Sequence, residues 1–286
     1  MAYAHFHQAP PIGTIFNNSD YDRLRNLQAG AIDYGVMGNP DVGPEKTVQY
    51  EIGYKQIVNP DLGFDLTIFY KDIRDLLGVE FIETYTGAEY PRLTNVDFGS
   101  AFGVTFAIDH RRIGPVRLAL DYTLLQALGN SSDPRETATR AAAGEDPRPR
   151  LVPFNWDQRH TMNLTAALSR PGDYSISTVI QAGSGQPYTP VIESGFGYGL
   201  ETNSGRKPAG IVVDLRAEKT VDLAVRSAIF LRVFNVFDAR YVNGAVFPST
   251  GSPFYSRFPG PDRVALGDAT RYYPPRRIEL GVRVGW

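Results

Sequence analysis

The chain has 286 residues and a formal net charge of -2, from 29 Lys and Arg against 31 Asp and Glu. It has no Cys, which excludes disulfides and thiolate metal sites, and its balanced charge gives no field to attract nucleic acid, so we expect no nucleic-acid partner. The 28 Gly, 21 Pro, 16 Tyr and 16 Phe favour strands and turns over helices, which predicts an all-β fold.

Alternation of apolar and polar side chains with period two predicts about ten strands. The opening segment "AYAHFHQ" is a single strand. Four pairs follow, each joined by a short turn: 50–55 with 64–71, 102–108 with 116–124, 162–168 with 174–181, and 213–217 with 229–233. In the closing strand, charged residues and glycine alternate with an apolar set, namely Ile278, Leu280, Val282, Val284 and Trp286.

The connections between these pairs are long and rich in Pro, Gly, Asn, Ser and charge, which is the composition of loops. They cover roughly residues 9–46, 77–97, 130–156, 187–209 and 239–275, and the stretch 133–150 has the composition of either a short helix or a solvated loop. Loops of this length count against a compact soluble domain. Short periplasmic turns alternating with long extracellular loops are typical of an outer-membrane barrel.

The alternation gives each strand one apolar row and one row of charged or small polar residues. In a soluble β-sandwich the apolar rows of two sheets would face each other, whereas in a membrane barrel they face lipid and the polar rows line a wet interior. The loop lengths favour the barrel, so we predict an antiparallel transmembrane β-barrel. If so, Val282→Arg should cost about 2–4 kcal/mol at the bilayer midplane, while Arg283 should tolerate polar exchange.

Six phrases add a resemblance to this pattern: "PEKTVQYEIGYKQ", "LGFDLTIFYKDIRDLLG", "FNWDQRHTMNLT", "GSGQPYTP", "FLRVFNVFDARYVN" and "PRRIELGVRVGW". In their order and spacing they resemble the C-terminal half of the barrel of a TonB-dependent outer-membrane receptor, across essentially the whole chain. The resemblance implies a 22-stranded barrel around an N-terminal plug, located in the outer membrane and in contact with its lipid.

The resemblance also implies a function and partners. Such receptors import a scarce nutrient, which is a siderophore, vitamin, peptide or glycan, with energy supplied through TonB, and they perform no chemistry on it. Trp286 would then be the C-terminal aromatic residue that the barrel-assembly machinery recognises, although an interfacial anchor explains an exposed indole equally well. No cofactor and no enzyme activity are implied.

The beginning of the chain departs from the family plan. "MAYAHFHQAP" lacks the basic and apolar regions of a signal peptide, and we find no plug-like segment. We therefore expect residues 1–286 to be the C-terminal portion of a receptor barrel, with the TonB contact made by a plug that lies outside this sequence.

Candidate catalytic and metal-binding residues are few. His5 and His7 share a strand face but no carboxylate cluster follows at ligand spacing, and His110 and His160 suit hydrogen bonding, so we expect no metal site and no catalytic site. "GSGQP" at 183–187 and "GPEKT" at 43–47 fit neither a phosphate-binding loop nor a nucleophile elbow. No ligand-binding residue can be named, and the aromatic loop at 239–260 fits either ligand stacking or packing upon itself.

Two alternatives remain open at this stage. A self-contained ten-stranded barrel could carry an omptin-like protease site at its extracellular rim, where Asp157 and His160 lie close in sequence. A soluble β-sandwich or adhesin would bury the apolar rows instead and remain monodisperse without detergent.

Overall fold

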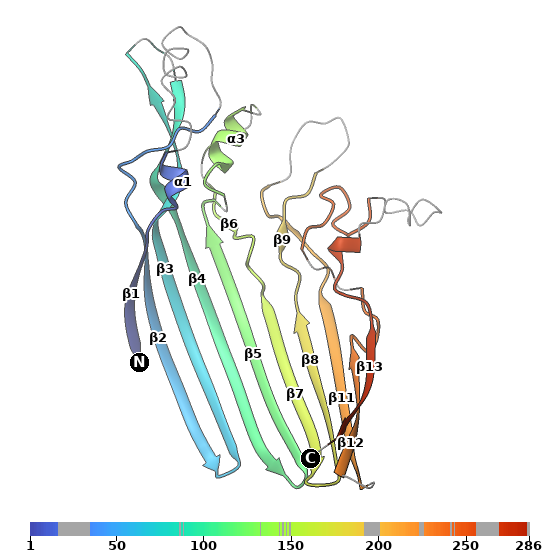
Figure 1. Ribbon diagram of the computed structural model, residues 1–286. Helices are drawn as coiled ribbons and strands as arrows, with labels where there is room; N and C mark the ends of the chain where they lie inside the picture. Colours follow the sequence, from blue (N-terminus) through green and yellow to red (C-terminus); the bar gives the residue numbers. More distant parts are fainter. Residues whose placement is uncertain are drawn as a thin grey trace. The chain divides into compact units, whose positions relative to one another are not determined.

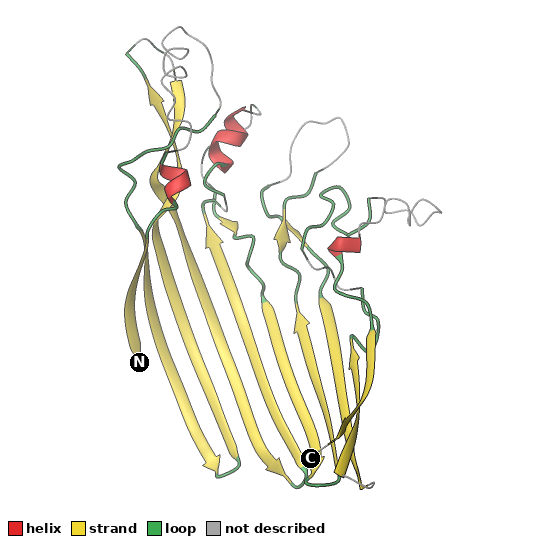
Figure 2. Ribbon diagram, in the orientation of Figure 1, coloured by secondary structure: helices red, strands yellow, loops and turns green. Residues whose placement is uncertain are grey.

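The structure is a computed structural model, and it describes residues 1–16, 35–85, 87, 89–131, 133–142, 144, 146, 148, 150–191, 201–222, 226–240, 242, 244–255 and 269–284. Figures 1 and 2 show long strands, with short helices confined to the connections between them. No helix within these ranges is long and apolar enough to cross a membrane.

The strands are β1 (Ala2–Gln8), β2 (Glu45–Asn59), β3 (Leu62–Glu83), β4 (Glu89–Ile113), β5 (Val116–Gly129), β6 (Val152–Pro153), β7 (His160–Arg170), β8 (Tyr174–Gly183), β9 (Pro187–Tyr188), β10 (Gly205–Arg206), β11 (Gly210–Asp222), β12 (Arg226–Phe234) and β13 (Arg277–Val284). The helices are α1 (Ile12–Ile15), α3 (Glu136–Ala142) and the 3-10 turn η1 (Ala269–Arg271). Helix α3 lies within the stretch 133–150, so the helical alternative for that stretch is confirmed.

Within the described residues, ten strands follow one another in the main sheet in the order β1-β2-β3-β4-β5-β7-β8-β11-β12-β13, with β6 beside β5. The pairings with a defined register are antiparallel, and β9 and β10 form a separate two-stranded ladder. The prediction of about ten antiparallel strands is therefore confirmed. The order of the strands in the sheet follows their order in the chain, because each tight turn joins two neighbouring strands.

The residues fall into two compact units. Unit 1 contains 1–51, 69–102 and 127–155, and unit 2 contains 52–68, 103–126 and 156–286. Strands β2 to β5 contribute to both, whereas β7 to β13 belong to unit 2 alone.

One predicted loop is wrong. Residues 77–97 are mostly strand, because β3 continues to Glu83 and β4 starts at Glu89. The alternation changes phase at Asp75, whose φ of 58° is left-handed, so that the exposed apolar positions before it are even-numbered and the buried Leu77 and Val79 after it are odd-numbered. The alternation was therefore missed beyond Asp75.

The extended part of this hairpin has its own small core in unit 1. The buried members are Val36, Val79, Leu93 and Ala138, the last from α3. An ion pair between Arg92 and Glu80 at 2.7 Å joins β4 to β3. Met37 pairs with Arg92 in an isolated bridge, in which Met37 N donates to Pro91 O and Met37 O accepts from Leu93 N, both at 2.9 Å. The segments 35–39 and α3 therefore cover what the sequence suggested was an open loop.

The long strands of unit 2 each have an apolar face and a polar face. On β13, Ile278, Leu280 and Val282 are 62%, 76% and 62% exposed. The register aligns Ile176, Ala217, Leu231 and Leu280 across four neighbouring strands of unit 2. The adjacent row on the other face contains Ser177, Arg216, Arg232 and Glu279. The sheet thus exposes its apolar row, which a soluble protein would bury.

Candidate functional site

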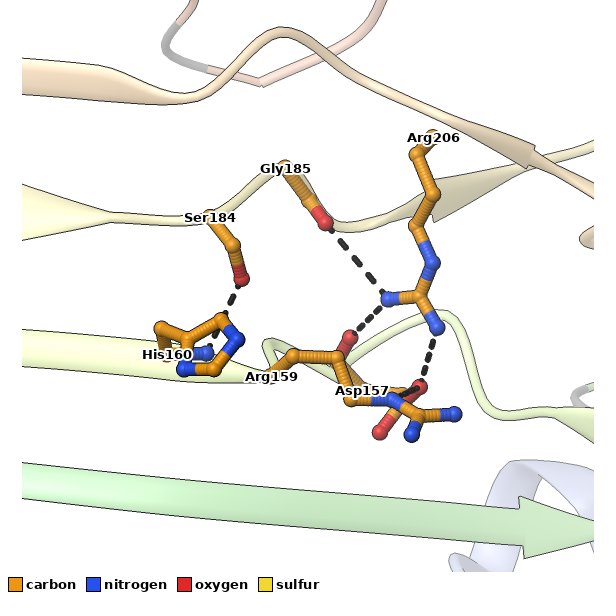
Figure 3. Close-up of polar contacts among 6 residues, drawn as sticks. All are labelled: Asp157, Arg159, His160, Ser184, Gly185 and Arg206. Atoms are coloured by element: carbon orange, nitrogen blue, oxygen red, sulfur yellow. Dashed lines mark hydrogen bonds and ion pairs between the residues drawn. The ribbon is translucent and has the colours of Figure 1, made fainter.

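Among the described residues of unit 2, a fully buried charge lies where the long loops begin. Asp157, in the segment before β7, has a side chain with 0% exposure, and its Oδ2 accepts a hydrogen bond from Arg159 Nε at 2.9 Å. Arg206 of β10 binds the same residue twice, through Nη2 to Oδ2 and Nη1 to the backbone carbonyl, both at 2.5 Å (Figure 3). We call these three residues the Asp157 cluster. Two guanidinium groups replace the water that a carboxylate loses on burial.

The loop that carries Arg206 reaches Asp157 because its base is closed. Pro187 and Tyr188 pair with Arg206 and Gly205, and Lys207 N donates to Gln186 O at 2.9 Å. A Cβ on Gly185 would lie 1.5 Å from Lys207 O, so only glycine permits this approach of the two chain segments. The "GSGQP" segment therefore has a structural explanation.

The same loop is held on its other side by the loop between β12 and β13. Lys207 Nζ donates to Gly244 O at 2.7 Å, and burial lowers the pKa of Lys207. Val191 N donates to Pro248 O at 3.1 Å. Tyr188 lies against Gly205 and Gly251: a Cβ on Gly205 would come within 2.6 Å of its ring, and a Cβ on Gly251 within 2.2 Å of its hydroxyl oxygen. The loops before β11 and before β13 are therefore joined at their bases.

Asn235 fixes the end of β12. It has a left-handed φ of 51° and is 1% exposed. Its side-chain amide donates to the carbonyls of Ala239 and Pro274, and its side-chain oxygen accepts from Ala239 N at 2.8 Å. Its own N–H donates to Asp214 Oδ1 of β11 at 2.8 Å. One buried amide thus ties both ends of the last long loop to the sheet.

The polar face of β11 to β13 carries ion pairs. Glu218 lies between Arg216 at 3.0 Å and Arg283 at 3.3 Å, and Glu279 lies between Arg277 at 3.1 Å and Arg232 at 3.6 Å. A cavity of about 290 Å³ opens on this face, lined by Ser177, Val179, Asp214, Leu215, Arg216, Arg232 and Phe234. The arrangement suits contact with polar or charged molecules, because it presents charged groups of both signs.

The amino-acid sequence carries a family match over most of its length. Residues 1–236 match the family described as "TonB dependent receptor-like, beta-barrel". The chain belongs to this family. The expectation from the six sequence phrases is thereby confirmed.

Solved structures of receptor barrels share its fold. The copper transporter OprC is 14% identical with a TM-score of 0.53, and the match covers 98% of this chain and 36% of OprC. The ferric-catecholate import receptor Fiu from E. coli K12 is 18% identical with a TM-score of 0.55, covering 98% of this chain and 31% of Fiu. The ferripyoverdine receptor of the Pseudomonas aeruginosa outer membrane is 12% identical with a TM-score of 0.58, covering 98% and 30%. The sequence has no match among curated proteins.

The chain spans about a third of the length of these receptors. It forms part of an outer-membrane β-barrel, so the exposed apolar face is its lipid-facing side and the polar face is its interior side. The tight turns are periplasmic and the long loops extracellular. The Asp157 cluster and Asn235 therefore lie where the wall of the receptor barrel meets its extracellular loops.

Unit 1 has a second buried carboxylate in the same kind of position. Asp97 of β4 is 5% exposed, and its Oδ1 accepts from Asn130 Nδ2 at 2.8 Å. More strand separates Asp97 from the periplasmic turn at Gly114 than the 9–11 residues that span a bilayer, so it lies outside the membrane. Burial, with a small contribution from the charge of Glu136, raises the pKa of Asp97 to about 6.

The predicted site residues fall into different places. His5 Nε2 contacts Tyr3 Oη at 2.5 Å on the lipid-facing side, and His7 follows on the same side. His110 Nδ1 is buried with no hydrogen-bond partner in the described part of the chain. Among the described residues no group of three or more His, Cys, Asp or Glu could hold a metal, and the absence of a metal site remains a prediction. Trp286 lies outside the described residues.

The pairing that the protease alternative requires is not present between Asp157 and His160. The carboxylate of Asp157 contacts two arginines, whereas His160 Nδ1 contacts Tyr122 Oη at 2.8 Å (Figure 3 shows the Asp157 contacts). His160 N donates to Ser184 Oγ at 3.0 Å. The family has a receptor fold, and these contacts give Asp157 and His160 structural explanations.

Proposed function

We propose that this chain forms part of the wall of an outer-membrane receptor that imports a scarce nutrient with energy supplied through TonB. The observation that carries the proposal is the two-faced sheet, with an apolar lipid side and an interior side lined by Arg216, Glu218, Arg232, Glu279 and Arg283, in a chain of the receptor family. A polar interior lets a hydrated ligand move through the barrel, while the apolar exterior remains in contact with lipid.

The ligand class is part of this proposal. Siderophores, vitamins, peptides and glycans are all candidates, and the similar structures are named for copper, a ferric catecholate and ferripyoverdine. Metal and metal–chelate uptake is therefore the first activity to measure. The receptor performs no chemistry on the ligand, and the contact with TonB is made through a plug domain of the whole receptor.

A transport assay in cells tests this function. The gene of the full-length protein is deleted, and uptake of iron-55 chelates and of copper is measured with and without complementation, in cells with and without TonB. We expect uptake that requires both the gene and TonB. Uptake that persists without TonB would refute the energy coupling, and unchanged uptake of every tested ligand class after deletion would refute the transport role.

A pair of substitutions tests the orientation of the wall. Val282 is 62% exposed on the lipid side of β13, whereas Arg283 contacts Glu218 at 3.3 Å on the interior side. Val282→Arg should destabilise the barrel by about 2–4 kcal/mol in urea titrations in lipid vesicles, and Arg283→Gln by less than about 1 kcal/mol. Equal effects at the two positions would contradict the orientation.

A further inference from the structure

Two arginines are directly opposite each other on the interior side of unit 2. The register aligns Arg216 of β11 with Arg232 of β12, and both line the cavity of about 290 Å³ on the polar face. Directly opposite residues on one face of an antiparallel pair have Cβ atoms about 4.5–5.5 Å apart, and like charges at that separation repel each other. This pair of guanidinium groups therefore favours a negative charge in the cavity.

The glutamates of this face do not supply enough negative charge. Within the described residues four arginines share two glutamates, and the contacts are Arg216 to Glu218 at 3.0 Å, Arg283 to Glu218 at 3.3 Å, Arg277 to Glu279 at 3.1 Å and Arg232 to Glu279 at 3.6 Å. A guanidinium has five N–H donors, so one shared carboxylate leaves donors available to a further anion.

Asp214 also lines the cavity, but its carboxylate has another contact. Its Oδ1 accepts from Asn235 N at 2.8 Å, and in the described part of the chain it forms no ion pair with Arg216 or Arg232. Ser177 adds a hydroxyl donor to the lining. The cavity therefore presents two guanidinium groups and one hydroxyl to a negatively charged oxygen.

The depth and size of the cavity limit what it can hold. The register pairs Gly210 with Gly183 at the extracellular ends of β11 and β8, and Arg216 lies about six residues further along β11, opposite Ser177. At about 3.3 Å per residue and a tilt of about 45°, Arg216 is about 14 Å below these strand ends. The cavity is much larger than one water, about 30 Å³, but is at the lower end of small-molecule sites. It therefore fits one charged arm of a ligand rather than a whole metal chelate.

We propose that Arg216 and Arg232 bind an oxyanion group of the transported ligand, such as a carboxylate, as the ligand moves along the interior of the wall. Guanidinium groups donate short, charge-assisted hydrogen bonds to such oxygens, and partial exclusion of water strengthens these bonds. Asp214 weakens the site by its charge, so that the anion can leave again. The transported ligand is then an anion or an anionic chelate. This inference rests on the proposed function and narrows its ligand class.

Chemical modification of arginine tests the site in the purified protein. The full-length receptor in detergent is treated with phenylglyoxal, which reacts with guanidinium groups, and the modification of each arginine is measured by peptide mass spectrometry with and without citrate. We expect citrate to slow the modification of Arg216 and Arg232 by about threefold, and glycerol to have no effect. Arg216→Gln should abolish the protection of Arg232. Asp214→Asn removes a repelling charge but keeps an oxygen that accepts from Asn235 N, so protection should need less citrate, a gain that misfolding cannot produce.

Arg117 supplies the matched control. It lies on the polar face of β5 with Asp109 at 3.9 Å, but the register places Ala167 opposite it instead of a second arginine. Citrate should leave its modification unchanged. The proposal is overturned if citrate protects Arg117 as much as the pair. It is also overturned if Arg216 and Arg232 resist modification without citrate, because a carboxylate of the receptor itself then fills the cavity.

Uptake measurements separate this proposal from the transport role. Cells are given iron-55 as two anionic chelates, ferric citrate and a ferric tris-catecholate, and as a cationic trihydroxamate chelate. For each anionic chelate taken up, Arg216→Gln and Arg232→Gln should raise the KM by about fivefold, whereas Arg117→Gln should leave it within about twofold. Uptake confined to the cationic chelate, or an unchanged KM in both variants, would overturn the anion site alone. If no chelate is taken up, the transport role fails, and the protection experiment still decides the anion site.

Discussion

Two buried carboxylates at the loop ends of the strands are stabilised in different ways. In unit 2, Asp157 is fully buried between the guanidinium groups of Arg159 and Arg206. In unit 1, Asp97 is 5% exposed and accepts a hydrogen bond from the neutral amide of Asn130. Burial disfavours a charge unless opposite charges compensate it. Opposite charges compensate the charge at the first site, whereas burial raises the pKa of Asp97 at the second.

The two sites also stabilise different parts of the chain. Arg206 connects the loop before β11 to the segment before β7, so the ion pair determines where an extracellular loop begins. Asn130 caps the pairing of β4 and β5 by exchanging hydrogen bonds with the backbone of Phe98, and Asp97 lies over Gly78, where a Cβ would come within 2.5 Å of it. Loop position thus depends on charge in unit 2 and on packing and protonation in unit 1.

The largest expected effect is at Asp157. Asp157→Asn keeps the side-chain shape but leaves Arg159 and Arg206, which are 36% and 34% exposed, without a negative partner. We expect local destabilisation of about 3–4 kcal/mol, the lower part of the cost of breaking a buried ion pair. Hydrogen exchange in the full-length protein should show faster exchange at Lys207 N, whose partner is Gln186 O, and at His160 N, whose partner is Ser184 Oγ.

The exposed pair of Asp146 and Arg148, at 2.8 Å, is the control for this prediction. Arg148 is 85% exposed, so Asp146→Asn should leave the same exchange rates close to those of the wild type. If Asp157→Asn is as mild as Asp146→Asn, the Asp157 cluster does not hold the loop.

A smaller effect, with a pH dependence, is expected at Asp97. Burial raises the pKa of Asp97 from its ordinary value of 3.8 to about 6 in the folded protein, so protonation favours folding. Its contribution is fully present below about pH 4 and is lost as the pH rises through 6, by up to about 3 kcal/mol. The measurement is hydrogen exchange at Phe98 and Asn130 between pH 4 and 8, corrected for intrinsic rates.

Two variants sharpen this test. Asp97→Asn should remove the pH dependence and make unit 1 more stable at neutral pH, because an amide has no charge to desolvate. Glu136→Gln should shift the transition slightly to lower pH, because the charge of Glu136 raises the pKa of Asp97. Protection that rises with pH in the wild type would contradict the assignment.

Much of the fold could be predicted from the sequence because alternation reports directly on which side chains meet lipid. The strands around the tight turns at Pro60, Gly114 and Gly172 were predicted for this reason. The extension of β3 was missed because its apolar positions change from even to odd numbers near Asp75. A single residue of positive φ leaves no signal in composition.

The loop-end clusters could not be predicted in the same way. Asp157 and Arg206 lie far apart in the sequence, and so do Asn235 and Pro274, so nothing local connects them. The phrases "FNWDQRH", "GSGQPYTP" and "FNVFDARY" did identify the family, and the structure shows buried contacts at each of them. The order and spacing of these phrases predicted a receptor barrel. The buried contacts in the structure explain why these residues occur at these positions.

The smallest expected effect is a difference in stability between alanine substitutions at two glycines, each of which lies beneath a phenylalanine ring. In unit 1, a Cβ on Gly129 would come within 2.3 Å of Phe154 and 2.9 Å of Phe98 O, and Phe154 is 5% exposed. In unit 2, a Cβ on Gly281 would come within 2.4 Å of Phe230, with all three of its nearest atoms in that ring. Buried Phe154 and a backbone oxygen cannot move aside, whereas the half-buried Phe230 ring can rotate.

Gly129→Ala should therefore cost about 1–3 kcal/mol and Gly281→Ala less than about 1 kcal/mol, measured by urea titration of the full-length protein in lipid vesicles. Phe154→Leu combined with Gly129→Ala should recover only part of the loss, because the contact with Phe98 O remains. Equal costs at the two glycines would show that Phe154 is as free to move as Phe230. Unit 1 would then lack the tightly packed loop end that distinguishes it from the ion-paired loop end of unit 2.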